Sequence, residues 1–175
     1  MRLNDVRGKP IVSADTGEKA GHVEDLLLDS PRHHIVGVLV SDGVLSKQRV
    51  LPFDQIQTVG VDAVIVTSLR TICDPGDWVS SGHPATRSRS VNGKEVVTAE
   101  GARIGKVRDL VADERTGDIV ALEIDSGRYG KRLSGPVLVH AIGEIPLTNA
   151  VVVVPSSVAA TRPDADAKDN RGRST

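Results

Sequence analysis

Two pairs of aspartates recur at matching positions in the two halves of the chain, and paired carboxylates are groups with which many enzymes do acid–base chemistry. Asp25 and Asp29 in the first half correspond to Asp109 and Asp113 in the second. No recognisable spacing places a base, a nucleophile or a metal ligand beside them. Carboxylates that recur in two copies of one fold usually accept hydrogen bonds from backbone amides at turns and strand ends. We therefore expect a structural role for them and no catalytic residues.

A second group of chemistry-bearing residues lies in the middle of the chain, where Cys73, Asp74, Asp77 and His83 suggest a metal site or a nucleophile. A structural zinc takes four ligands, mostly Cys and His, and one of each falls short. No orienting acid accompanies a Cys73–His83 pair. Residues 74–77, with their proline and glycine, fit a turn. We expect no metal and no internal disulfide, since the chain has a single cysteine.

One cluster has the composition of an RNA contact, because it combines cations with an aromatic ring that can stack on a base. It consists of Arg128, Tyr129, Lys131 and Arg132. The whole chain, however, has 22 basic and 23 acidic residues and a net charge of −1. That balance excludes strongly electrostatic nucleic-acid binding and a polybasic membrane patch. The glycine-rich segment 101–107 lacks the Ser or Thr that a phosphate loop needs, so no cofactor is expected.

The composition favours strands over helices. Of 175 residues, 39% are hydrophobic, yet three are aromatic and 26 are valine. Side chains that branch at Cβ are stiff and favour pleated strands. The first residues lack the apolar core of a signal peptide, and no apolar run reaches membrane-spanning length. We expect an all-β, cytoplasmic protein with no direct membrane insertion.

An internal duplication organises these elements. At an offset of 84 to 85 residues, segment 8–13 matches 93–98 and segment 17–26 matches 101–110. With small gaps, Pro52 aligns with Pro136 and residues 63–66 align with 150–153. Shared glycines carry most of the signal, because each marks a turn with restricted backbone geometry.

The duplication predicts a first repeat over residues 1–69 and a second over 89–156. Residues 70–88 between them are rich in proline, glycine and serine and predict a linker. Residues 157–175 carry almost no apolar side chains, so we expect a disordered tail.

Within each repeat, short branched runs alternate with turn signals, which predicts small barrels. The expected strands of the first repeat are 10–13, 21–28, 34–41, 48–51, 55–59 and 62–67. Those of the second are 95–99, 105–112, 118–125, 135–140, 144–146 and 149–154. No window shows a helical period over 11 residues or more. The expected fold class is all-β, with two tandem small barrels related by duplication.

The third strand of each repeat indicates where the barrels meet other surfaces. Alternation directs Val36, Val38 and Val40 to the core of the first repeat, and Val120, Leu122 and Ile124 to that of the second. It leaves Ile35, Gly37 and Leu39 outside, with Leu39 where the second repeat has Glu123. This outer face is apolar enough to need a cover.

A barrel of about 65 residues is marginal alone, so we expect the two barrels to pack on each other, with an outside protein partner as the alternative. Trp78 is expected to anchor the linker in the groove between the barrels. If it were exposed, it would become a candidate hot spot for a partner. Ile35, Leu39 and Trp78 are therefore the candidate interaction surface.

The ordered set of motifs resembles the PRC-barrel domain family. It comprises an opening Gly-Lys-x-Val-Val, then Gly-x-x-x-Gly-x-Val-x-Asp-Leu, Ile-Val-x-Leu-x-Ile-Asp and a closing Ala-Val-x-Val, and most of it occurs twice. The resemblance implies a six-stranded barrel with a short helical turn. That domain also forms the soluble part of the photosynthetic reaction-centre H subunit and the C-terminal domain of a ribosome-maturation factor.

The resemblance implies a module for protein interaction or assembly rather than an enzyme, and it transfers no catalytic residues. We expect such a module, with an unidentified protein partner. One alternative is an RNA-processing or ribosome-assembly accessory protein. A membrane-associated scaffold is another, and it would need a protein tether because the sequence contains no membrane span.

Overall fold

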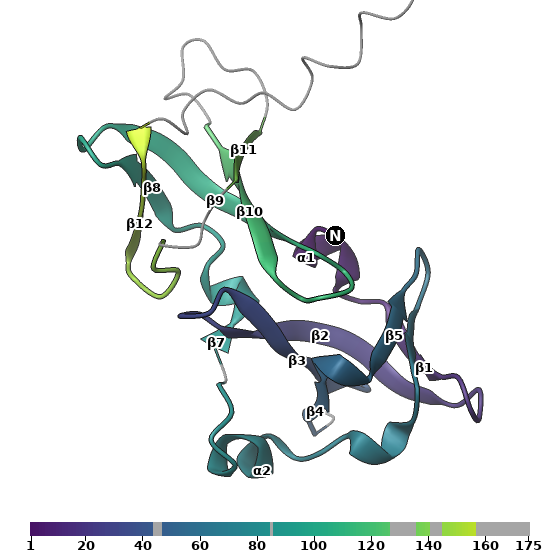
Figure 1. The fold of residues 1–175 in the computed structure, drawn as a ribbon. Helices are drawn as coiled ribbons and strands as arrows, with labels where there is room; N and C mark the ends of the chain where they lie inside the picture. Colours follow the sequence, from purple (N-terminus) through teal and green to yellow (C-terminus); the bar gives the residue numbers. More distant parts are fainter. Residues whose placement is uncertain (44–46, 85, 127–135, 141–144, 157–175) are drawn as a thin grey trace, which may run out of the picture.

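The computed structural model describes residues 1–43, 47–84, 86–126, 136–140 and 145–156, which form two sheets (Figure 1). The first sheet contains β1 (Pro10–Ser13), β2 (Lys19–Asp29), β3 (His34–Ser41), β4 (Arg49–Pro52), β5 (Ile56–Val59), β6 (Val64–Val66) and β7 (Thr86–Arg87). The second contains β8 (Glu95–Thr98), β9 (Arg103–Ala112), β10 (Ile119–Asp125), β11 (Val137–His140) and β12 (Val151–Val154). The helical segments are short: α1 (Leu3–Val6), η1 (Phe53–Gln55), η2 (Leu69–Thr71), α2 (Pro75–Ser80) and η3 (Ser88–Ser90).

The two sheets have one topology. The strand order is β4-β3-β2-β1-β6-β5 in the first and β11-β10-β9-β8-β12 in the second, with β7 added beside β2. The β1–β6 and β8–β12 pairs are parallel, and the other pairs are antiparallel. The expected all-β fold of two tandem barrels is confirmed. In the predicted strand 144–146, residue 144 lies outside the described residues, as does the tail 157–175. Ile145 and Pro146 are not in a strand, and Pro146 has no N–H to donate.

The register of the sheets corrects the later part of the repeat alignment. In the first sheet, Pro52 lies opposite Gly37 of β3. The residue equivalent to Gly37 in the second repeat is Ala121 of β10, and His140 lies opposite it. Pro52 therefore corresponds to His140, not to Pro136. Strand register also shows that residues 63–66 correspond to residues 151–154, one residue further along the chain than the alignment gave. Four more residues separate β10 from β11 than separate β3 from β4, and sequence alignment alone did not locate them.

A bulge in the third strand of each repeat changes which side chains reach the core. Val36 and Val120 are extra residues opposite the long strands β2 and β9. Because a bulge reverses the alternation before it, Ile35 and Ile119 turn into the core. Ile35 is fully buried, whereas Val120 is 43% exposed. The predicted outward position of Ile35 and the predicted core positions of Val36 and Val120 are therefore wrong.

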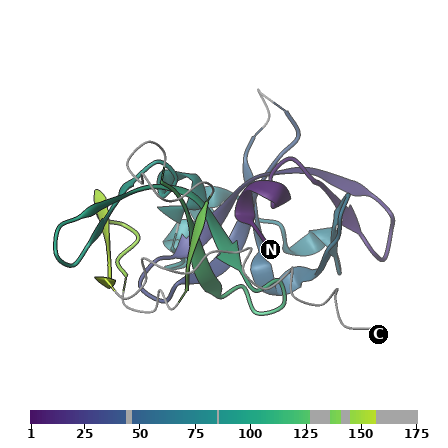
Figure 2. The same cartoon turned by 90° about the horizontal axis from the view of Figure 1, so that it is seen from above.

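The leading segment of the first repeat (Met1–Val6) packs on the second repeat. Its Met1 carbonyl accepts the backbone N–H of Ala112 at 2.8 Å, and Arg2 forms a β-bridge with Val111 of β9. Figure 2 shows α1 in the middle of the molecule, between the two sheets.

The leading segment of the second repeat, residues 86–91, makes the reciprocal contact with the first. Its strand β7 pairs with β2, where Arg87 lies opposite Leu27 and Thr86 opposite Leu28. Leu27 and Val111 are equivalent positions of the duplication. The two repeats therefore exchange their leading segments about a pseudo-two-fold axis, as two subunits of a symmetric dimer would.

The hairpin loops that follow β2 and β9 meet at the same axis. The backbone N–H of Ile35 donates to the carbonyl of Gly117 at 2.9 Å, and that of Ile119 donates to His33 at 2.7 Å. Gly117 has φ +82° and the equivalent His33 has φ +51°. His33 thus adopts the left-handed conformation that Gly117 adopts in the other repeat. Both residues need it because each of their carbonyls accepts a backbone N–H from the hairpin of the other repeat.

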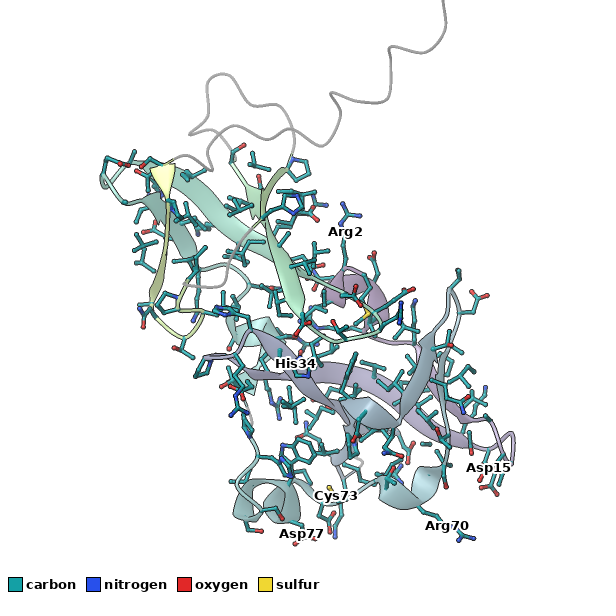
Figure 3. All side chains as sticks on the ribbon, viewed as in Figure 1. Arg2, Asp15, His34, Arg70, Cys73 and Asp77 are labelled. Atoms are coloured by element: carbon teal, nitrogen blue, oxygen red, sulfur yellow. The ribbon has the colours of Figure 1, made fainter. Side chains whose placement is uncertain are left out.

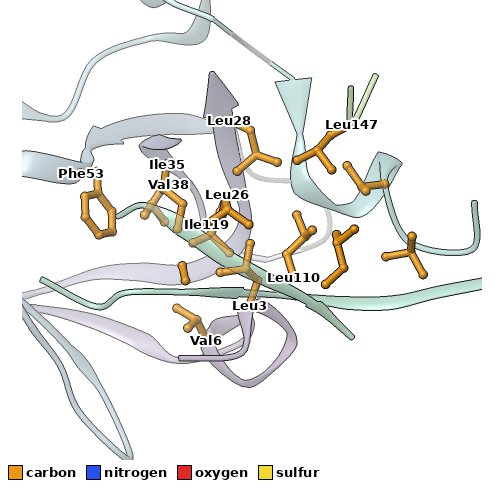
Figure 4. Packing of buried hydrophobic residues seen from close by; sticks show 14 of the residues in the cluster. Leu3, Val6, Leu26, Leu28, Ile35, Val38, Phe53, Leu110, Ile119 and Leu147 are labelled. Carbon is orange, nitrogen blue, oxygen red and sulfur yellow. The ribbon is translucent and has the colours of Figure 1, made fainter. Parts of the chain in front are cut away.

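These exchanges join the apolar cores of the repeats. One contiguous cluster of buried side chains contains residues of α1, of both long hairpins and of both closing strands. In Figure 4, Leu3 and Val6 of α1 lie among residues of both sheets, including Leu26, Ile35, Leu110 and Ile119. The two barrels therefore share one hydrophobic core.

Two buried aspartates tie the leading segments to the long strands. Asp109 is 2% exposed and accepts the backbone N–H of Leu110 at 2.8 Å and that of Asn4, in α1, at 3.1 Å. Burial raises the pKa of Asp109, and the two amide bonds oppose that shift. The expectation that these acids bind backbone amides is confirmed.

Asp25 makes the equivalent contacts in the first repeat. Its Oδ1 accepts the N–H of Leu26 at 2.9 Å and the hydroxyl of Ser88, from the other leading segment, at 2.7 Å. Arg7 lies 3.3 Å from the same oxygen and also donates to Ser88. Both aspartates therefore hold the exchanged segments in place.

The shared core predicts that truncating a side chain of α1 destabilises both repeats together. Leu3→Ala should lower the free energy of unfolding by about 2–5 kcal/mol, because Leu3 is fully buried. Urea unfolding followed by circular dichroism measures this loss. Val61→Ala, at a position 89% exposed, is the control and should change it by less than about 0.5 kcal/mol. A loss confined to one of two separate transitions would contradict the shared core.

The raised pKa of Asp109 predicts a pH-dependent difference between the natural chain and Asp109→Asn. A carboxyl whose pKa is higher in the folded state stabilises the fold below its ordinary pKa and loses that contribution as the pH rises through the raised value. Relative to the asparagine variant, the natural chain should therefore lose stability as the pH rises above the ordinary aspartate pKa of about 4. Urea titrations at several pH values test this, and a difference that is constant or grows with pH would refute it.

Candidate binding groove between the two repeats

A groove of about 560 Å³ opens where the first repeat, the linker and the second repeat meet. This volume is in the usual range for ligand sites. Its wall is rich in rings, which come from His34 of β3, Phe53 of η1, and Trp78 and His83 of the linker. Arg115 and Thr116 of the β9–β10 loop also line it. The groove is thus assembled from three segments distant in the sequence.

The loop of the second repeat is held against Phe53. A Cβ at Gly117 would lie 2.7 Å from Cε1 of Phe53, so only glycine permits this approach. Asp113 fixes the loop by accepting the backbone N–H groups of Thr116 at 3.0 Å and Arg115 at 2.8 Å. These bonds hold the pKa of the Asp113 carboxyl below its usual range. The loop that contributes Arg115 to the groove wall therefore has a fixed backbone conformation.

His34 lies at the junction of the two repeats (Figure 3). Its Nδ1 is 3.0 Å from Oδ1 of Asp118, across the pseudo-two-fold axis. Its ring meets Phe53 edge-on, with ring centroids 6.4 Å apart. Hydrogen bonds from Thr116 and from His34 lower the pKa of Asp118. The His34 ring is therefore positioned by contacts to both repeats.

The linker closes the end of the groove through Trp78. Its indole packs on Leu27, Leu39 and Val50, on the outer face of the first sheet. The indole N–H donates to the carbonyl of Pro84 at 2.9 Å. In Figure 1, α2 lies on the side of the first sheet away from the second repeat. Trp78 therefore does anchor the linker, as predicted. Its indole is seated on the outer face of the first sheet rather than between the two barrels, and it also contributes to the groove wall.

The structure also corrects the candidate interaction surface. Ile35, Leu39 and Trp78 have 0%, 3% and 5% exposure, so they do not form an open surface. The other barrel covers Ile35, because the bulge turns it into the shared core. The linker helix covers Leu39. Ile35 and Trp78 do line the groove, whereas Leu39 lies beneath the linker.

The linker lies on the first repeat because the equivalent face of the second has bulkier or charged side chains in place of Gly37 and Leu39. Trp78 lies over Gly37, where a Cβ would come within 3.3 Å of Cζ2 of the indole. The second repeat has Ala121 at the equivalent position and Glu123 in place of Leu39. Glu123 pairs with Arg2, at 2.6 Å, on the face that Trp78 would otherwise cover.

The linker cysteine does not have the environment of a nucleophile. Burial raises the pKa of the Cys73 thiol, and the charge of Asp77 adds to that shift. Its Sγ contacts the carbonyl of Val50 at 3.7 Å. His83 is stacked on Trp78, with ring centroids 4.2 Å apart. Among the described residues, no three metal-ligating side chains gather at one point.

Two further sequence expectations concern nucleic acid and membrane. The proposed RNA contacts Arg128, Tyr129, Lys131 and Arg132 lie outside the described residues. No helix in the described ranges is both long and apolar enough to cross a bilayer.

Sequence reasoning missed three of the groove residues: Phe53, His34 and Arg115. Phe53 is one of three aromatic residues in the chain, and that rarity was the available signal. His34 and Arg115 lie in the two turns after the long strands, and their proximity depends on the meeting of the two hairpin loops.

Trp78 is the single tryptophan, so its fluorescence reports the seating of the linker. Gly37→Val should displace the indole, shift its emission to longer wavelength and cost about 1–3 kcal/mol, because the added methyl groups overfill the contact. Gly76→Ala on α2 is the control, since a Cβ there meets nothing within 4 Å. An unchanged emission spectrum for Gly37→Val would show that Trp78 is not held over this position.

Comparison with known families agrees with the duplicated topology. The model of the PRC-barrel domain family matches residues 1–71 and again residues 85–159. A comparison with curated proteins found no match. The two matched ranges cover most of the chain. The first contains α1 and strands β1 to β6, and the second contains strands β8 to β12 and the leading segment with β7. The chain therefore belongs to the PRC-barrel domain family and carries two copies of that domain in tandem.

Proposed function

We propose that this chain is a non-enzymatic interaction or assembly module that holds a segment of a protein partner in the groove between its repeats. The observation that carries the proposal is the composition of the groove wall. Both repeats and the linker contribute to it, and it combines Trp78 and Phe53 with Arg115. Tryptophan and arginine are enriched among the residues that dominate binding energy at protein interfaces.

The environment of the reactive side chains supports a binding role over catalysis. His83 is stacked on the indole of Trp78. The thiol of Cys73 has a raised pKa, which disfavours the nucleophilic thiolate at neutral pH. A nucleophile would instead need a base within hydrogen-bond reach and a lowered pKa.

Pre-formed walls also support a binding role. Phe53 is 7% exposed and Trp78 is 5% exposed, so both rings are fixed by packing before any partner arrives. The loop that carries Arg115 is fixed by Asp113. A rigid site loses little conformational entropy on binding, and a partner then gains affinity from contacts that already have the right geometry.

A photo-crosslinking amino acid placed in the chain tests the proposal in cells. With the crosslinker at His83, in the groove wall, irradiation should give a discrete set of crosslinked protein products. The matched control places it at Val61, which is 89% exposed and outside the groove. Products of equal pattern and yield from the two positions, or none from His83, would overturn the proposed function.

A further inference from the structure

Residues 74–84 of the linker are held together by hydrogen bonds among themselves. The backbone N–H of Trp78 donates to the carbonyl of Asp74 at 3.1 Å, and that of His83 donates to Trp78 at 3.3 Å. The indole N–H donates to Pro84, at the end of the same segment, and the ring of His83 stacks on the indole. Within the part of the chain that the structure describes, no hydrogen bond or ion pair joins this segment to either sheet.

A single side chain attaches the segment to the first sheet. Trp78 packs on Leu27, Leu39 and Val50, in a hydrophobic cluster that is separate from the shared core. It is the one buried residue of α2, and its neighbour Val79 is 54% exposed. Release of the indole would therefore free the whole segment without opening the core that joins the two barrels.

The two ends of the segment are anchored independently of Trp78. Cys73 exchanges two backbone hydrogen bonds with Val50, at 2.8 and 3.0 Å. At the other end, Thr86 of β7 pairs with Leu28 of β2. The helix α2 between these anchors has six residues, far fewer than an isolated helix needs to be stable in water. Its position between two fixed ends therefore depends on the seating of the indole.

We propose that residues 74–84 form a strap that opens and closes over the first sheet while the two barrels stay joined, and that the groove binds its partner only when the strap is closed. Segments with few buried apolar contacts open locally at a lower free energy than the whole fold. Trp78 and His83 both belong to the strap and both line the groove. Opening therefore removes two rings from the groove wall.

This inference rests on the proposed function and names the regulation of the same site. A partner that needs the closed strap binds with an affinity reduced by the fraction of chains in which the strap is open. Conversely, a bound partner shifts the strap toward its closed position. The seat beneath the indole thus controls binding at a groove that it does not itself line.

The experiment follows two probes in one urea titration of the intact chain. The emission of Trp78, the single tryptophan, reports the seating of the strap, and far-ultraviolet circular dichroism reports the two sheets. We expect the emission to move to longer wavelength at a lower urea concentration than the one at which the sheets unfold. Coincident transitions would overturn the inference, because the indole would then be released only when the shared core unfolds.

A matched pair of leucine variants separates the two events. Leu39→Val removes one methylene from the seat, which should make the open strap about fourfold more populated and lower the midpoint of the emission change. The midpoint of circular dichroism should stay the same, because position 39 is uncovered once the strap is open. Leu26→Val, in the shared core, should have the reverse pattern. Equal shifts of both midpoints in Leu39→Val would contradict a separate opening.

Control of the groove is tested with the photo-crosslinker at Asp54, which lies in the groove wall but outside the strap. Leu39→Glu buries a carboxylate beneath the indole, so it should hold the strap open, where that carboxylate is in water. The yield of crosslinked protein in cells should then fall. Val61→Glu, at an exposed position outside the groove, is the control and should leave it unchanged.

The strap and the proposed function fail separately. Equal yields from Leu39→Glu and the natural chain would overturn the control of the groove by the strap, while products from the natural chain still support the proposed function. If the natural chain gives no products from either groove position, the proposed function is overturned, whereas separate emission and circular dichroism transitions still support the opening of the strap.

Discussion

The backbone bonds between each leading segment and the long strand of the other repeat are the constraint on which the rest of the structure depends. A barrel of this size buries only about 60% of the surface of its unfolded chain, which leaves little stability. The exchange adds α1 to the second barrel and β7 to the first. Side chains of both barrels and of α1 then form one contiguous hydrophobic core. Asp25 and Asp109 then satisfy the exposed amides of the exchanged segments. Each repeat is therefore completed by its partner.

A duplicated fold with a pseudo-two-fold axis provides two equivalent outer faces, and the side chains at positions 37 and 39 of the first repeat make its face suitable for the linker. Gly37 and Leu39 make an apolar seat for the indole of the linker. The second repeat has Ala121 and Glu123 at these positions, and Glu123 is neutralised by Arg2 from the exchanged segment. The linker therefore lies on the first repeat, and the groove forms beside it. Divergence of the copies thus places an asymmetric groove on a pseudo-symmetric scaffold.

Sequence patterns predicted the strands, the turns and the duplication, because these depend on local preferences of glycine and branched residues. The faces of the third strands were mispredicted because a single bulge residue, Val36 or Val120, reverses the alternation. The left-handed conformation of His33 carries no glycine signal. The exchange of leading segments and the groove depend on pairings between residues about 60 to 110 positions apart, which alternation and turn chemistry do not encode.

The exchange also determines how the groove behaves as a binding site. His34 and Arg115 come from opposite hairpin loops, and those loops are joined by backbone bonds at the axis. Any motion that parts the repeats must therefore break the groove wall as well as the shared core. A ligand of the groove then binds only the assembled chain, and it stabilises the junction by RT ln(1 + [L]/Kd). Binding of a ligand in the groove and association of the two repeats are in this way coupled, which agrees with the proposed role as an interaction module.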